Sequence, residues 1–204
     1  MKKSKISIVV IVVLLIALTV SVWQNISHVN KQNNARQLLM NQVHSCFRNV
    51  SLTLDGLIIN LENGDTSDDT NNATILQICN YLVRADALLT QYRNYFPTPI
   101  MQYGSTFYSF EYIAYTLGGI GGEANGVRYN SVLQGNGISD KEIRYLAALR
   151  DDMVNACAAM ESDESSPQED KKLTISHLNT ILDEFFDKWS PHNEDSPFFL
   201  LQSE

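Results

Sequence analysis

The residues of this chain best suited to chemistry are one acidic side chain and the aromatic side chains around it. Glu111 is the only charged residue between Arg93 and Glu123. Nine of the 17 Tyr and Phe residues fall between Tyr92 and Tyr115. A carboxylate among aromatic rings can supply the polar group of a small-molecule pocket. The candidate ligand-binding residues are therefore Tyr103, Tyr108, Glu111, Tyr112 and Tyr115.

A plainer interpretation of Glu111 is structural. The carboxylate would lie on the solvent side of its helix or pair with Arg84 or Arg93 of the preceding helix. Structural ion pairs outnumber catalytic acids in such settings, and we favour this interpretation over a catalytic one.

Motifs for metal binding and catalysis are missing from the sequence. HExxH, GxSxG and CxxC do not occur, and the four histidines have no ligand spacing. The acidic run at residues 63–72 lacks the spacing of a calcium loop, and the glycines from Gly119 to Gly122 are not preceded by a predicted strand. We predict no catalytic residue, no metal site and no cofactor, and hence a protein that is not an enzyme.

The three cysteines, Cys46, Cys79 and Cys157, are too few for a disulfide-built scaffold. Cys46 and Cys79 fall on the apolar stripes of consecutive predicted helices. An antiparallel hairpin of these helices would offset the two residues by roughly 13 Å along the axis, at 1.5 Å per residue. A disulfide needs Cα atoms within about 7 Å. We predict no disulfide and expect Cys46 and Cys79 to pack in the core, whereas the sequence leaves Cys157 unassigned.

The chain is organised around an uncharged segment, residues 6–23, which follows a short basic tail, residues 1–5. As a helix this segment would be about 27 Å long, close to the roughly 30 Å of hydrocarbon in a bilayer. Its basic flank predicts a cytoplasmic N-terminus and an extracytoplasmic remainder. We favour an uncleaved transmembrane anchor. The alternative is a cleaved signal peptide, for which Thr19-Val20-Ser21 is the one candidate site.

Beyond the anchor the pattern is helical. Residues 24–36 form a polar stalk, predicted as helix, residues 37–190 a bundle domain, and residues 191–204 a C-terminal tail. Apolar residues recurring at three and four predict five helices, with no strand outside the anchor. Their approximate ranges are 39–60, 73–96, 103–117, 139–160 and 174–189. We predict an all-α fold, in which a transmembrane helix precedes an antiparallel bundle of four to five helices.

Two further sequence features concern the start of one bundle helix and a stretch between helices. Ser139 and Glu142 have the spacing of a capping box, and Ile138 can pack on Ile143. Residues 118–137 hold seven of the ten glycines. This stretch is too rich in glycine for a continuous helix, so we expect a long flexible loop that serves as a linker or a lid.

Charge narrows the possible functions. Residues 24–204 carry 12 Lys and Arg against 23 Asp and Glu, a net charge of −11. This charge repels nucleic acid, which we exclude as a partner. We expect a single-pass protein of a bacterial cell membrane, held in the bilayer through residues 6–23. Its domain would serve interaction with an unidentified protein, or sensing. The alternative is a small-ligand-binding module that uses the aromatic cluster under the glycine-rich loop.

Overall fold

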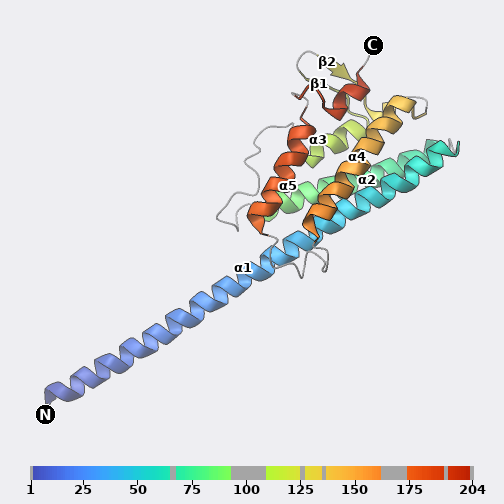
Figure 1. Cartoon of the computed structure of the whole chain (residues 1–204). Coiled ribbons are helices and arrows are strands. Elements are labelled where there is room, and N and C mark those ends of the chain that lie inside the picture. The colour runs from blue at the N-terminus through green and yellow to red at the C-terminus, as the bar shows by residue number, and fades with distance from the viewer. Residues whose placement is uncertain are drawn as a thin grey trace. The chain divides into compact units, whose positions relative to one another are not determined.

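The computed structural model of the chain describes residues 2–64, 68–92, 109–124, 127–134, 137–161, 174–190 and 193–202. Within these ranges it contains five α-helices, two short β-strands and two 3-10 helices (Figure 1). The all-α class predicted from the sequence is confirmed. The chain separates into two compact units, residues 1–37 and residues 38–204.

The first unit consists of the N-terminal part of α1, a helix that runs from Lys2 to Glu62. The large apolar side chains from Val10 to Val22 are 47–63 % exposed, and Trp23 is 69 % exposed. Among the described residues, α1 is the one helix long and apolar enough to cross a membrane. The polar residues 24–36 belong to the same helix.

The second unit begins with the rest of α1, which ends at a turn where Gly64 adopts a left-handed φ of 80°. α2 follows from Asp68 to Tyr92. It begins earlier than predicted, and its first turn carries two acidic residues, which favour a helix N-terminus. Most of the apolar stripe predicted for each helix is buried, whereas Leu61 and Cys79 are partly buried and Phe96 lies outside the described residues. The buried members are Leu39, Val43, Cys46, Phe47, Val50, Leu54, Leu57 and Ile58 on α1, and Ile75, Ile78, Leu82, Ala85 and Leu89 on α2.

α3 is shorter than the sequence pattern predicts. It runs from Phe110 to Leu117, and Ser109 is its N-cap in extended backbone, where the hydroxyl accepts a hydrogen bond from the Tyr112 N–H. The predicted helix over 103–117 is therefore wrong as one element, because a capping serine fixes the start at 110. Residues 101–108 lie outside the described ranges.

The glycine-rich segment contains two short strands, so the prediction of no strand outside the anchor is wrong here. β1 (Gly122–Ala124) pairs antiparallel with β2 (Val127–Tyr129), and a 3-10 helix, η1, covers Val132–Gln134. Ser131 and Val132 are each only 1 % exposed. The expected flexible loop is thus wrong for the described part of this segment, which packs against α3 and the C-terminal residues.

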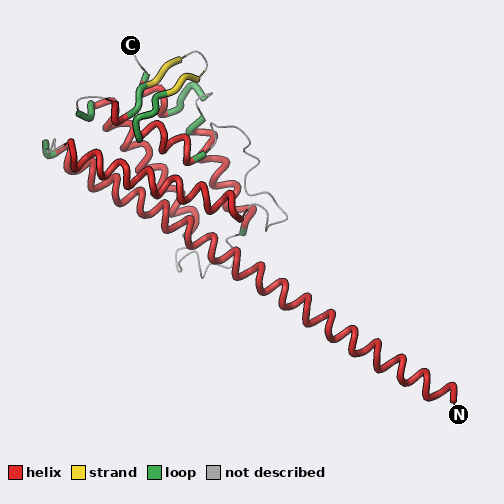
Figure 2. Tube along the Cα trace, turned by 180° about the vertical axis from the view of Figure 1, so that it is seen from behind, coloured by secondary structure: helices red, strands yellow, loops and turns green. Residues whose placement is uncertain are grey.

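α4 (Asp140–Met160) and α5 (Ile175–Lys188) complete the bundle. The predicted capping box at Ser139 is confirmed, because its hydroxyl and the Glu142 carboxylate each accept the other residue's N–H. The chain then ends in a second 3-10 helix, η2 (Pro197–Leu201). Figure 2 shows the hairpin and the C-terminus at the same end of the bundle.

The C-terminal tail belongs to the core. Phe198 and Leu201 are 2 % and 4 % exposed, and the Asn130 N–H donates to the Leu201 carbonyl at 2.9 Å. The Phe198 ring lies 5.8 Å from the Trp189 ring and 5.9 Å from the Tyr145 ring. The tail therefore packs against α4, the end of α5 and strand β2 at one end of the bundle.

Candidate functional site

Of the five residues predicted to form an aromatic ligand site, the structure describes Glu111, Tyr112 and Tyr115. Glu111 and Tyr115 lie together on α3, where the Tyr115 hydroxyl donates to Glu111 Oε1, and Tyr115 is 44 % exposed. Tyr112 lies elsewhere on the helix, with its ring 5.4 Å from that of Phe198. Tyr103 and Tyr108 fall outside the described residues. Two of the five residues are thus in direct contact.

A second carboxylate lies close to Glu111. Asp86 of α2 accepts the Phe110 N–H at 3.2 Å, so it satisfies an N–H at the start of α3. Burial raises the pKa of Asp86, and the nearby Glu111 charge raises it further against the hydrogen bond from Phe110. The hydrogen bond to Glu111 raises the pKa of Tyr115. The hydrogen bond to Asp86 fastens the start of α3 to α2, and Glu111 is half-buried beside it.

The most buried charged group among the described residues is Asp152 of α4, which is 8 % exposed. Its Oδ1 accepts from Lys188 Nζ at 2.7 Å, and its Oδ2 accepts from the indole N–H of Trp189 at 2.8 Å. Both oxygens therefore have partners, as a buried carboxylate requires. This centre was not predicted from the sequence, although a charged residue on the apolar stripe of α4, between Leu149 and Met153, is the signal that marks it.

A groove of about 200 Å³ opens beside Asp152, between α4 and α5. Two alanines of α4 leave the space, and apolar side chains of α5 form the facing wall. The lining residues are Asp152, Asn155, Ala156, Ala159, Ile181, Glu184, Phe185 and Lys188. A second hollow of about 230 Å³ lies at the start of α4, but there Ser139 and Glu142 already hold each other in the capping box. The α4–α5 groove is the better candidate site.

A histidine and a cysteine meet at the C-terminal end of α4. His44 Nε2 lies 2.5 Å from Glu161 Oε1, and the Cys157 thiol donates to the His44 carbonyl at 3.9 Å. Burial, and then the Glu161 charge, raise the pKa of Cys157 to about 12. A thiol with so high a pKa is a poor nucleophile and a poor metal ligand. No group of three metal-ligating side chains occurs in the described part of the chain.

Cys46 and Cys79 point to different neighbours. Cys79 donates to the Ala114 carbonyl of α3 at 3.3 Å, whereas Cys46 is buried on α1 within the electrostatic influence of Arg84. Burial raises the pKa of Cys46, and it raises that of Cys79 to about 11. All three cysteines are free thiols.

We therefore expect Cys79 and Cys157 to be alkylated slowly by iodoacetamide in the folded chain at neutral pH, because the thiolate is the reactive form. The rate should increase as the pH rises toward about 11 for Cys79 and about 12 for Cys157. Timed alkylation of the full chain, followed by non-reducing peptide mapping, measures both reactivity and pairing. Fast labelling at neutral pH without denaturant, or a linked Cys46–Cys79 peptide, would contradict this description.

Comparison of the chain with protein-family models, with curated proteins and with solved structures finds no match.

Proposed function

We propose that the chain is a single-pass membrane protein whose helical domain, on the extracytoplasmic side, serves protein interaction or sensing. The observation that carries the proposal is the exposure pattern of α1. Apolar side chains from Val10 to Val22 are exposed all round the helix, whereas from Leu39 onward one stripe is buried in the bundle. A helix that is apolar on every side suits a lipid environment. Trp23 would then lie at the end of the membrane span, where indole rings favour the membrane–water interface.

The interaction half of the proposal is supported by the surfaces of α1 and α2 that face away from the core. Leu52 and Ile59 of α1 are 61 % and 48 % exposed, and Leu76 and Val83 of α2 are 51 % and 40 % exposed. Each pair is spaced by seven residues, so its members lie on one side of their helix. Apolar residues repeated along one helix face are typical of helix-mediated recognition.

The ligand-binding alternative has less support. Tyr112 packs on Phe198, whereas the Tyr115 hydroxyl donates to Glu111 on the same helix, so the polar groups of Glu111 and Tyr115 already engage each other. We therefore place interaction or sensing first.

The orientation is tested with a membrane-impermeant maleimide on intact cells. A cysteine placed by Asn60→Cys, at an exposed position of α1, should be labelled in intact cells. A cysteine placed by Ser4→Cys, in the basic tail, should be labelled only after lysis. The opposite pattern would reverse the topology. A labelled domain found in the soluble fraction without residues 1–23 would show that the segment is a cleaved signal peptide.

The interaction is tested by placing a photo-crosslinking amino acid at Leu52 or Leu76 of the full chain in cells. We expect each to give a defined protein adduct, whereas the exposed polar position Asn60 of α1 should not. Equal adducts at all three positions, or none at any, would contradict an interaction surface on α1 and α2.

A further inference from the structure

The α4–α5 groove has the size of one side chain rather than of a whole ligand. Its volume of about 200 Å³ lies below that of pockets that enclose drug-sized molecules, which begin near 300 Å³. The small side chains of Ala156 and Ala159 create the hollow on α4, and Ile181 and Phe185 line it from α5. An apolar stem of four or five atoms would lie along these surfaces.

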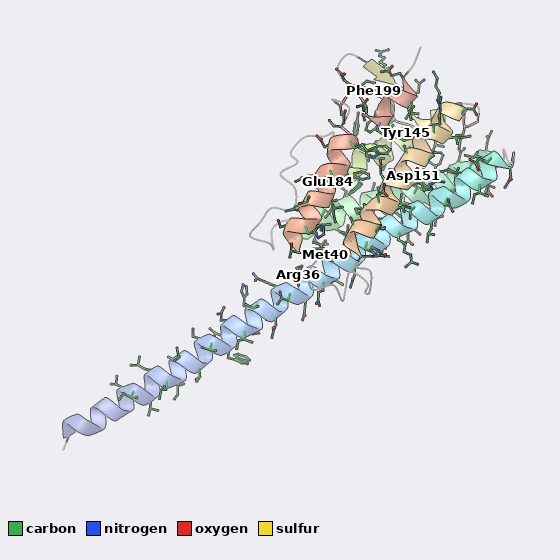
Figure 3. The ribbon with its side chains drawn as sticks, in the orientation of Figure 1. Arg36, Met40, Tyr145, Asp151, Glu184 and Phe199 are labelled. Atoms are coloured by element: carbon green, nitrogen blue, oxygen red, sulfur yellow. The ribbon has the colours of Figure 1, made fainter. Side chains whose placement is uncertain are left out.

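The polar groups of the groove fix the sign of the charge it prefers. Lys188 lies 2.7 Å from Asp152, so its positive charge is already matched by that carboxylate. Glu184 lines the groove from an exposed position on α5 (Figure 3). Two carboxylates and one ammonium leave the lining with a net negative charge, in a part of the chain whose net charge is −11. A cation is therefore the complementary occupant.

We infer that the groove is an anchor site for a lysine side chain of a partner protein. The methylene stem of the lysine would lie on Ile181, Phe185 and the two alanines, and its ammonium would reach Glu184 at the rim. An anchor residue that fills a small pocket is the usual centre of a protein interface, and the acidic surface would steer a basic partner toward it. This inference rests on the proposed interaction function and assigns to it a second surface, separate from the α1–α2 hairpin.

The test uses the full chain in phosphatidylcholine nanodiscs, with methyl NMR signals of Ala156, Ala159 and Ile181 as reporters. The probe is N-acetyl-lysine N-methylamide, and its uncharged isostere, N-acetyl-norleucine N-methylamide, is the matched compound. We expect the lysine compound to shift the reporter signals in a saturable way at lower concentration than the norleucine compound. Glu184→Gln should weaken binding of the lysine compound about three- to fivefold, as expected for the loss of one exposed ion pair.

Two further variants complete the design. Asp187→Asn removes the same charge from the same helix without altering the groove lining, and it should leave the binding unchanged. Ala159→Leu fills the hollow from an exposed helix position and should abolish the shifts. Equal binding of the two compounds, unchanged binding in Glu184→Gln or Ala159→Leu, or no shift at the reporters would overturn the inference. In that case adducts at Leu52 and Leu76 would still support the interaction function, so the two failures are distinguishable.

Discussion

Phe198→Ala should lower the free energy of unfolding of the domain by about 3–5 kcal/mol, the usual cost of removing a fully buried phenyl ring. Phe198 is 2 % exposed, and its ring contacts those of Tyr112, Tyr145 and Trp189 at centroid distances of 5.4, 5.9 and 5.8 Å. These rings belong to three different helices or helix ends, so no single neighbour can move to fill the cavity.

The neighbouring residue provides the control. Phe199 lies in the same 3-10 helix but is only partly buried (Figure 3). Phe199→Ala should therefore cost less than about 1.5 kcal/mol. Denaturant unfolding of both full-length variants in nanodiscs, followed by far-ultraviolet circular dichroism, measures the difference. Equal losses for the two variants would show that the tail is not docked as described.

Asp152→Ala should cost about 2–4 kcal/mol, because it leaves the buried indole N–H of Trp189 without its acceptor. The hydrogen bond to Trp189 accounts for most of this loss. Lys188 contributes less, because its side chain is 53 % exposed and water screens its charge.

Asp152→Asn keeps an oxygen that can accept from the indole N–H. Its loss of stability should therefore be at most half of that caused by Asp152→Ala. Asp151→Ala is the matched control, since Asp151 is exposed and pairs with Arg150 at the surface (Figure 3). Its effect should stay within about 0.5 kcal/mol. The same unfolding measurement serves all three variants. If Asp152→Asn proved as damaging as Asp152→Ala, the charge rather than the hydrogen bond would hold α4 and α5 together.

The parts of the fold that could be predicted are those set by local sequence. The stripe from Leu39 to Ile58 predicts a helix because its spacing matches the helical turn. Ser139 and Glu142 mark the start of α4 because capping needs only four residues. The hairpin was missed because strands of three residues are too short to show alternation. The dipeptide Asn125-Gly126 in the sequence between them is the stronger signal, because this pair is typical of tight hairpin turns.

The candidate site was predictable only in part, because some of its contacts join residues far apart in the sequence. The contact of Glu111 with Tyr115 follows from their spacing of four on one helix. That Tyr112 faces Phe198 depends on where the last residues of the chain pack, and no local pattern reports this. The α4–α5 groove likewise arises from two alanines on one helix and two apolar residues on another. The sequence alone does not mark either pair of residues as part of a groove, because the groove forms only when α4 and α5 pack together.

The burial of Phe198 and Leu201 has a consequence for biosynthesis. These residues leave the ribosome after α1 to α5, yet they close the end of the core beside Tyr145 and Trp189. The helices made earlier therefore keep that end of their apolar surface exposed until residues 197–201 have been synthesised. In the proposed topology this interval includes passage through the translocation channel, and the nascent domain needs protection from aggregation throughout it.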